Sequence, residues 1–548
     1  MKFDLEHDWQ GNMSTPRKNL GEKTKLHLFF VLSLIFLSTG LIGHEPWRPL
    51  ESTSISIILD IIQNNQVILP MAASENLITH PPLYSYVAAA FGKLFSPILP
   101  LHDAARLSNI FWLALTLISL GLITRELWGQ GFGRQAGLLF IGSVGLILNV
   151  HSLIPEIATL LGYTMCLYAF SLYFRRPFRA SMVLGFGSGI AFLSGGMTPL
   201  IVIFLSSIFL LIFTNWRNKR YFIFLGISAT INILIITPWI YAFYYLEPGL
   251  FISWLSEIQF STKLLFNYHL QGILWFTWPA LPLAIWLITK DYKLISSQKR
   301  LQIPIAFLIA LFITTSITGQ PNQTNLIPYI IPLSIIAVGG IDRLNRGTAS
   351  ALNWFGILIF GFIGFLVWLG WFAMMTEMPQ KIYERMFYQS ANYIAEFNLF
   401  SFLFALVITS LWLGSIIKFK ITNRSAISNW AIGVTMVWVT LMMLWTPFID
   451  NRKEYKLIFT DVKQQLTKSS TCVYVNNLSS SQVNLLHYYS GIKGTNPNLE
   501  SKDCRLALVS LTKERKIPAE YKMWNEIWTG KRLIDKNYFV LLAKEVKR

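Results

Sequence analysis

Long apolar runs separated by short polar segments fill the first 447 residues of the chain. The first run, from Leu26 to Gly43, reads LHLFFVLSLIFLSTGLIG. Runs of about 18 or more apolar residues match the thickness of the hydrocarbon core of a bilayer. The pattern predicts a polytopic α-helical membrane protein with about 13 transmembrane helices, at 25–43, 104–124, 135–151, 156–174, 181–196, 198–214, 221–243, 271–289, 301–318, 326–341, 352–374, 399–417 and 429–447.

The pattern changes in the last hundred residues. Short β-like runs (TCVYVNN, RLALVSL and YFVLLAK) alternate there with polar helical stretches, which predicts a small α/β domain. We therefore divide the chain into an N-terminal segment (1–24), a transmembrane part (25–447) and this domain (448–548). The first large loop of the transmembrane part spans 44–103.

Basic residues mark alternate loops of the transmembrane part. The loops 152–155, 194–198 and 319–325 hold no Lys or Arg. The other set is rich in them: Arg125, Arg134, Arg175, Arg176, Arg179, Arg217, Lys219, Arg220, Lys290, Lys293, Lys299, Arg300, Arg343, Arg346, Lys418, Lys420 and Arg424. Because positive loops stay in the cytoplasm, we expect a cytoplasmic N-terminus and a C-terminal domain on the outer side.

The segment 83–98 is also apolar, but a crossing there would move every later basic loop to the outside. It is short, follows Pro81–Pro82 and contains Lys93. We therefore place it at the membrane surface and keep thirteen crossings, with fourteen as the alternative.

The composition agrees with a membrane protein. Only 14% of the residues are charged, against about 25% in soluble domains. The formal net charge of +18 is poor support for nucleic-acid binding, because the Lys and Arg residues sit in short loops between apolar runs. Membrane lipids with anionic headgroups are the expected partners instead.

The first outer loop holds the candidate chemistry. Glu45 and Glu51 lie just after the first apolar run, where a carboxylate can serve as a general base for an acceptor hydroxyl or amine. Arg and Lys side chains on the same side can hold a phosphate; the candidates are Arg48, Arg106, Lys263 and Arg385. A solvated surface role is the competing interpretation for each acid.

Cysteine and metal motifs add little. An oxidising compartment permits a disulfide between Cys472 and Cys504, but the sequence does not show whether their Cα atoms lie within reach, so both forms stay open. The chain has no HExxH motif, no Cys-His cluster and no Walker loop. No cofactor is expected from the sequence, and the need for a divalent cation stays open.

Several weak motifs follow one another in a specific order. The first outer loop reads WRPLESTSISII, then VILP, then THPPLYSY, and the next helix reads AARLSNIFWLALTLISLGLITRELWG. Pro155–Glu156, SGIAFLSGGMTP, Pro238–Trp239 and PYIIP follow. Over roughly residues 25–345 this order resembles the bacterial C-type glycosyltransferases of the aminoarabinose-transferase and protein O-mannosyltransferase superfamily.

The resemblance implies a fold and a reaction. It implies the C-type glycosyltransferase fold in the bacterial inner membrane, with a periplasmic C-terminal domain. It also implies transfer of a sugar from a polyprenyl-phosphate donor to a lipid or envelope glycan acceptor such as lipid A, with inversion at the anomeric carbon.

The resemblance also implies roles for individual residues. Glu51 corresponds to the catalytic base, with Glu45 as the reserve. The substrate-binding residues would be Arg48, His80, Arg106, Lys263, Tyr84 and Tyr329. The chain departs from the family pattern at the aspartate of the acidic motif and at the lysines of two later motifs, which leaves the sugar and the acceptor open; the residues there are Leu50, Thr79, His80 and Gly195.

Two other classes remain as alternatives. A lipid-linked polysaccharide ligase or polymerase is also polytopic, but it usually carries its large loop late in the chain. A transporter or flippase tends to show internal repeats and polar residues in broken helices, and this sequence has no convincing repeat.

Overall fold

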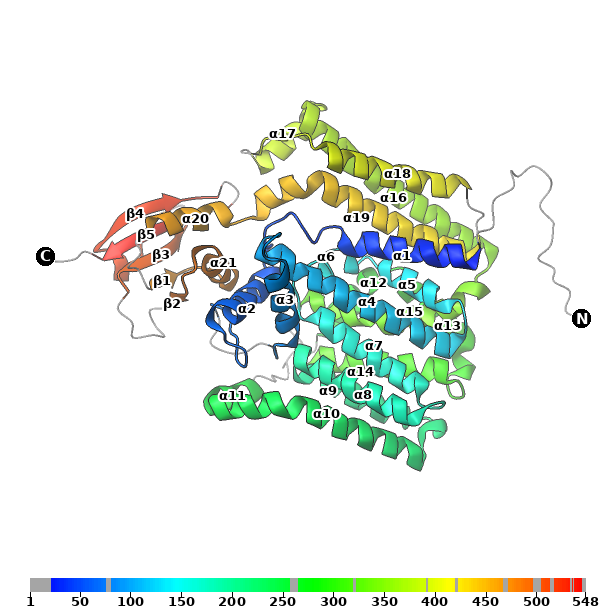
Figure 1. Cartoon of the computed structure of the whole chain (residues 1–548). Coiled ribbons are helices and arrows are strands. Elements are labelled where there is room, and N and C mark those ends of the chain that lie inside the picture. Colours follow the sequence, from blue (N-terminus) through cyan, green and yellow to red (C-terminus); the bar gives the residue numbers. More distant parts are fainter. Residues whose placement is uncertain are drawn as a thin grey trace, which may run out of the picture.

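Long helices that run side by side form most of the molecule (Figure 1). The computed structural model describes residues 21–74, 80–256, 265–318, 322–390, 393–418, 422–466, 472–495, 504–512, 517–532, 535 and 537–544. The long helices of the bundle are α1 (Glu22–Ser38), α4 (Leu101–Trp128), α5 (Phe132–Ile141), α7 (Glu156–Leu172), α8 (Pro177–Gly195), α9 (Met197–Leu210), α10 (Lys219–Leu246), α12 (Phe266–Phe276), α13 (Ala280–Asp291), α14 (Lys299–Thr318), α15 (Ile330–Gly340), α16 (Arg346–Thr376), α18 (Leu399–Lys418) and α19 (Asn423–Lys453).

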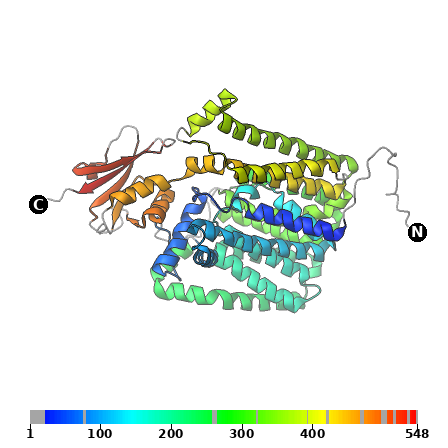
Figure 2. The ribbon, with the colours of Figure 1, turned by 45° about the horizontal axis from the view of Figure 1, so that its top comes forward.

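Shorter helices gather where the chain leaves the bundle. Near the end that also carries the C-terminal domain (the domain end) lie α2, α3, α11 and α17, while α1 begins at the opposite end (Figures 1 and 2). The short elements are α2 (Leu50–Asn64), α3 (Leu83–Phe95), α6 (Leu146–Asn149), α11 (Pro248–Ser256), α17 (Gln380–Gln389), η1 (Thr214–Trp216), η2 (Tyr292–Leu294), η3 (Gln323–Tyr329) and η4 (Ile341–Arg343).

Helices lie over the expected membrane spans. Within the described residues, eight are long and apolar enough to cross a membrane, and a bent pair, α12 with α13, would make a ninth. The helices α7 and α9 are apolar but shorter. The chain is thus a multi-pass membrane protein, while the number of thirteen crossings stays a prediction.

Two expected spans are not continuous helices. The span 135–151 is divided into α5 and α6, and α12 meets α13 at a bend of 103°. The breaks lie against each other: the amide of Val144 donates to the carbonyl of Trp278 at 3.3 Å, and that of Gly145 to Phe276 at 2.8 Å. Each break therefore satisfies backbone groups that the other exposes, as a non-helical backbone within a membrane requires.

The segment expected at the membrane surface forms α3. It has 13 residues, and a helix of that size is about 20 Å long, too short for a hydrocarbon core of about 30 Å. It runs crosswise to the long helices in both views (Figures 1 and 2).

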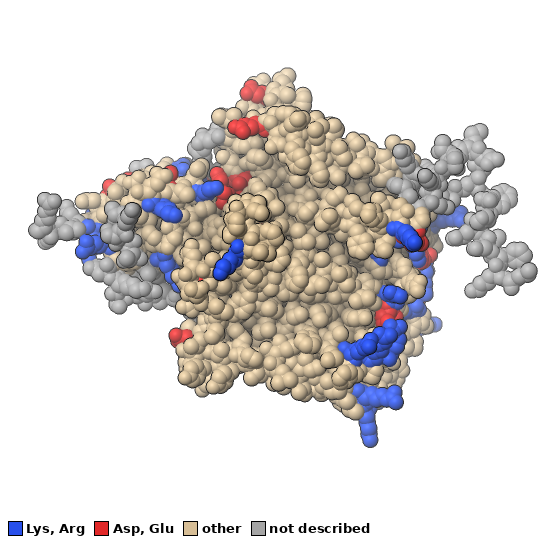
Figure 3. All heavy atoms as spheres, in the orientation of Figure 1, with Lys and Arg blue, Asp and Glu red and all other residues tan. Residues whose placement is uncertain are grey.

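Charged side chains avoid the middle of the bundle. Lys and Arg gather at the N-terminal end of the bundle and again on the C-terminal domain, and a broad belt between them is almost free of charge (Figure 3). Large apolar side chains are exposed on the belt helices, among them Phe222, Phe362 and Leu411. Such a belt is the surface expected to face lipid.

The C-terminal domain is a five-stranded sheet with two helices. Its order is β2-β1-β3-β5-β4, parallel between β1 and its two neighbours and antiparallel at β3–β5 and β5–β4. The elements are α20 (Lys456–Gln465), β1 (Val473–Asn476), α21 (Ser480–Ser490), β2 (Gly494–Thr495), β3 (Leu506–Leu511), η5 (Ala519–Tyr521), β4 (Trp524–Gly530) and β5 (Tyr538–Lys544). A disulfide, which the sequence left open, joins Cys472 to Cys504 with Cα atoms 5.4 Å apart.

The central strand β3 explains why this tail folds as a layered domain. All six of its residues are buried. Leu506 and Leu508 face the core that includes Leu485 and Leu486 of α21, while Ala507 and Val509 pack with Tyr521 on the other face. The boundary expected at residue 448 stays a prediction, and α19 continues as one helix to Lys453.

Candidate functional site

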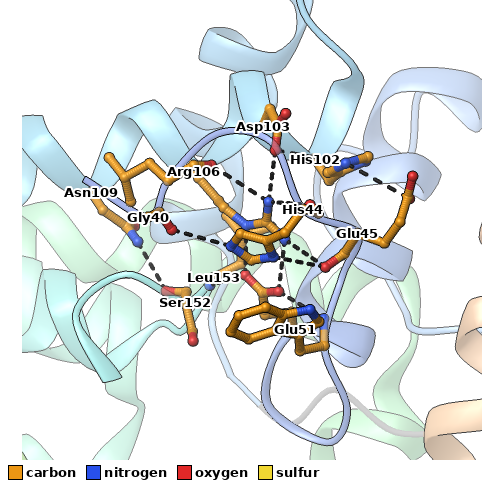
Figure 4. A network of polar contacts seen from close by, with 12 residues as sticks. Gly40, His44, Glu45, Glu51, His102, Asp103, Arg106, Asn109, Ser152 and Leu153 are labelled. Atoms are coloured by element: carbon orange, nitrogen blue, oxygen red, sulfur yellow. Dashed lines mark hydrogen bonds and ion pairs between the residues drawn. The ribbon is translucent and has the colours of Figure 1, made fainter. Parts of the chain in front are cut away.

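The loop after α1 folds around one buried arginine at the domain end. Arg106, on α4, is fully buried, and its guanidinium makes a bidentate pair with Glu51 at 2.8 Å for both bonds. The same group donates to Asp103 at 2.7 Å and to the carbonyl of His44 at 2.8 Å (Figure 4). Weaker bonds reach the carbonyls of Leu41 and Glu45. We call Arg106, Glu51 and Asp103 with these backbone partners the Arg106 network.

Glu51 stands in the first turn of α2 and is only 1% exposed. Its oxygens also accept the amides of Trp47 at 2.9 Å and Leu153 at 3.1 Å. Burial works to raise the pKa of Glu51, but the charge and hydrogen bonds of Arg106 outweigh it and lower this pKa to about 2. The carboxylate therefore joins three segments of the chain and keeps little capacity for a further partner.

Asp103 holds the other side of the loop. It lies three residues before Arg106 on α4, the spacing that places two side chains on one helix face. Its second oxygen accepts the amide of Gly43 at 2.9 Å. Gly40 begins the loop with a φ of 83°, and a Cβ there would come within 2.7 Å of Trp438. The loop can therefore run close to α19 only with glycine at this position.

Glu45 connects the loop to the C-terminal domain. Its two oxygens bind the Nζ of Lys456 at 2.6 Å and the hydroxyl of Tyr489 at 2.9 Å. Burial works to raise the pKa of Glu45, but the hydrogen bond from Lys456 and the nearby His102 bring it below its ordinary value. Asp450, near the end of α19, accepts the backbone amide of Glu45 and the indole of Trp47, each at 3.0 Å.

Further polar contacts fix α2 and α4 to helix α21. The ring of His102 contacts the hydroxyl of Tyr488 at 2.8 Å. The side chain of Asn484 accepts the amide of Ser74 at 2.9 Å and donates to Thr53 at 3.3 Å. The C-terminal domain is thus fastened to the loop 44–103 at several points.

The structure brings only some of the predicted site residues together. Glu51 and Arg106 are paired. Asn109 accepts the hydroxyl of Tyr84 at 2.8 Å. Asn109 also donates to the carbonyl of Ser152 at 2.9 Å, next to Leu153, whose amide donates to Glu51 (Figure 4). Arg48 is half-buried on the same loop, 3.5 Å from the hydroxyl of Ser479.

Other predicted residues lie elsewhere. Tyr329 is fully buried, and its hydroxyl contacts Thr315 at 2.6 Å, with the ring of His269 6.5 Å away. His80 is exposed at the start of α3, and Arg385 lies on α17. Lys263 lies outside the described residues.

The geometry bears on two of the predicted roles, which stay predictions. Arg106 cannot supply a phosphate contact as it stands, because it is fully buried and its nitrogens are occupied by carboxylates and carbonyls. Glu51 is poorly placed as a general base, since a base needs an open lone pair and a path to the acceptor. Both residues hold the loop in place.

The sequence interpretation missed several members of this site. Asp103 could have been recognised, because HDAAR places an acid and an arginine three residues apart on one helix face. Asp450, Lys456 and Tyr489 carry no comparable signal, since they lie about 400 residues further along the chain. Among the described residues, no group of three or more His, Cys, Asp or Glu side chains is arranged to hold a metal ion.

The bundle, the crosswise helices of the loop 44–103 and the C-terminal α/β domain together define a multi-pass membrane protein with the C-type glycosyltransferase fold. Two crystal structures of ArnT from Cupriavidus metallidurans, one bound to undecaprenyl phosphate and one in the apo state, share it with a TM-score of 0.69 and 14% sequence identity. The first match covers 96% of this chain and 99% of that chain.

The other comparisons with known proteins found weaker matches or none. The archaeal oligosaccharyltransferase AglB from Archaeoglobus fulgidus matches with a TM-score of 0.48 and 10% identity, over 89% of this chain and 69% of that chain. No protein-family model matches the chain, and no curated protein matches it in sequence.

Proposed function

We propose that this protein is an inverting glycosyltransferase that moves a sugar from a polyprenyl-phosphate carrier to a lipid or glycan acceptor at the membrane surface. The observation that supports it best is the likeness to ArnT over nearly the full length of both chains, including the C-terminal domain. One of those ArnT structures holds undecaprenyl phosphate, which is a carrier lipid of the proposed class.

The chemistry requires a carboxylate on the face of the sugar opposite the leaving phosphate, because a single displacement inverts the anomeric carbon. Most acids of the domain end are occupied. Besides the paired Glu45, Glu51 and Asp103, the carboxylate of Asp60 binds the amide of Met71 and the side chain of Asn64.

Glu156 differs from these acids. It is the first residue of α7, is half-buried, and has no hydrogen-bond or ion-pair partner among the described residues. Burial raises the pKa of Tyr84, a residue assigned to the substrate site from the sequence, and the charges of Glu51 and Glu156 raise it further. We propose Glu156 as the acceptor base and Glu51 and Glu45 as positioning residues.

The orientation also belongs to the proposal. Loops without Lys or Arg alternate with basic loops along the chain. This alternation supports a cytoplasmic N-terminus, a periplasmic C-terminal domain and location in the bacterial inner membrane. Reporter fusions at the two ends test it: alkaline phosphatase should be active only when fused after the C-terminal domain. Activity of the N-terminal fusion would reverse the orientation.

The function is tested with membranes that contain the overexpressed protein and a panel of radiolabelled polyprenyl-phosphate sugars. Transfer of label to an extractable acceptor is expected, and Glu156→Gln should lower kcat by about 10²–10⁴-fold. Glu247→Gln is the matched control, since Glu247 is an exposed acid after α10. An EDTA arm tests whether a divalent cation is required.

Glu51→Gln separates a positioning role from a catalytic one. A positioning role predicts lower thermal stability together with lower activity, because the variant weakens a buried ion pair. Lost transfer with unchanged stability in Glu51→Gln, and normal transfer in Glu156→Gln, would make Glu51 the base instead. Absence of transfer from every donor, with label only moved across the bilayer, would favour a flippase.

A further inference from the structure

A cavity of about 390 Å³ lies between the first outer loop, the end of α19 and the C-terminal domain. Four cationic side chains line it, together with Pro49 and Ser481 and one carboxylate, that of Asp535; the cations are Arg48, Arg452, Lys453 and Arg532. We call it the cationic cavity. Its volume falls in the range of small-ligand sites, about 300–1,000 Å³.

Three of these cations lie over aromatic rings, and one of the three, Arg532, also pairs with Asp535. The guanidinium groups of Arg48 and Arg532 lie 4.3 Å and 3.9 Å from the ring centre of Tyr455. The ammonium of Lys453 lies 4.6 Å from the ring centre of Trp47. A ring face attracts a cation without neutralising it, so the positive charge stays available to an anion.

The one carboxylate of the lining is already shared. Asp535 accepts a hydrogen bond from the hydroxyl of Tyr455 at 2.8 Å and lies 3.3 Å from Arg532. The formal charge of the described lining is therefore strongly positive. Ser481 belongs to the first turn of α21, and the N-terminus of a helix adds a further partial positive charge.

The level of the cavity relative to the membrane indicates a lipid ligand. Arg452 and Lys453 are the last residues of α19, a helix long and apolar enough to span the membrane. Charged residues directly after a span lie at the level of the headgroups. A smaller hollow of about 50 Å³ shares Arg48 and Lys453 with the cavity and is lined by apolar side chains, among them Trp47, Leu50, Leu148 and Trp438.

We propose that the cationic cavity binds the phosphate group of an anionic lipid headgroup, with the start of its apolar chain directed toward the smaller hollow. Its role as the anchor of a phosphorylated lipid acceptor rests on the proposed glycosyltransferase function; binding itself does not. Guanidinium groups suit this ligand because they bind phosphate oxygens in pairs.

The test uses the full-length protein in a neutral detergent. Native mass spectrometry with titration measures binding of dioleoyl phosphatidic acid, with dioleoyl phosphatidylcholine and inorganic phosphate as separate arms. The variant Arg48→Gln/Arg532→Gln should bind phosphatidic acid at least about tenfold more weakly, as expected when charge-assisted bonds are lost. The double Arg→Lys variant keeps both charges but loses the paired contacts, so its affinity should lie between those of the parent protein and the double Gln variant.

Lys531→Gln is the matched control. Lys531 precedes Arg532, but its ammonium lies over the ring of Tyr538 at 4.7 Å and it does not line the cavity. Unchanged binding in the double Gln variant, with thermal stability equal to that of the parent protein, overturns the proposal. Binding of inorganic phosphate alone that depends on both arginines, without binding of phosphatidic acid, overturns the lipid assignment.

The outcomes separate this proposal from the enzymatic one. Arginine-dependent lipid binding without sugar transfer from any donor supports the cationic cavity as a lipid-binding site and refutes the proposed function. Sugar transfer with an unchanged KM for the acceptor in the double Gln variant supports the proposed function and refutes the acceptor role of the cavity.

Discussion

Two groups of arginines at the domain end have opposite surroundings. In the Arg106 network, one guanidinium meets two carboxylates and several carbonyls, and none of it is exposed. The lining of the cationic cavity holds four cations and one carboxylate, and three of the cations lie over aromatic rings. A neutralised, buried cation stabilises the fold, whereas an excess of half-buried or exposed cations is suited to bind an anion.

The largest effect is expected in the Arg106 network. Arg106→Gln leaves Glu51 and Asp103 close together and buried without their cation, which costs about 3–5 kcal/mol of unfolding free energy. This destabilisation should be seen as a loss of the monodisperse peak in fluorescence-detected size-exclusion chromatography. Arg343→Gln is the control: this arginine is half-exposed and pairs with Asp291 at 2.6 Å, so its loss should cost less than about 1 kcal/mol. Equal effects of the two changes would contradict the comparison.

A pH dependence follows from the same network. The pKa of Glu51 is lowered from an ordinary 4.5 to about 2. The ion pair therefore contributes its full stability above pH 4.5 and loses it as the pH falls toward 2. Burial, with the nearby Arg106, lowers the pKa of His44 to about 4, which adds a loss of stability as the pH falls from 6.5 to 4.

Glu51→Gln isolates the contribution of the carboxylate. The thermal midpoint of the variant should lie below that of the parent protein at neutral pH, and the gap should narrow as the pH falls from 4.5 toward 2, because a protonated Glu51 resembles glutamine. A gap that stays constant over this range would show that the charge of Glu51 does not stabilise the fold.

The same contrast explains what the sequence could and could not predict. Apolar runs predicted the helices, because the bilayer thickness sets the length of an apolar run locally in the sequence. The break at Gly142–Gly145 was missed because its partner, at Phe276–Trp278, lies far along the chain. In the sequence, an acid and an arginine such as Glu51 and Arg106 look alike whether they are paired with each other or open to a ligand.

The burial of a charged side chain distinguishes a paired, structural residue from one that is open to a ligand, and this burial depends on segments distant in the sequence. Arg48 was predicted in an anion site, but its companions Arg452 and Arg532 come from α19 and from the C-terminal domain. The carboxylate of Glu45 was predicted as a reserve base, yet Lys456 and Tyr489 occupy it. Site membership here is set by tertiary contacts between the two ends of the chain.

The smallest effect on stability, and the most informative, is expected at Arg48. Arg48→Gln removes one cation from a site that already holds an excess, so the lost ring contact of about 0.5–1 kcal/mol is offset by relief of repulsion. The thermal midpoint should therefore hardly change in the absence of lipid. The stabilisation that phosphatidic acid gives to the parent protein should be reduced, because a ligand stabilises a protein in proportion to its affinity. A fall in the midpoint as large as that of Arg106→Gln would show that Arg48 is a structural cation too, and the distinction between the two groups would be lost.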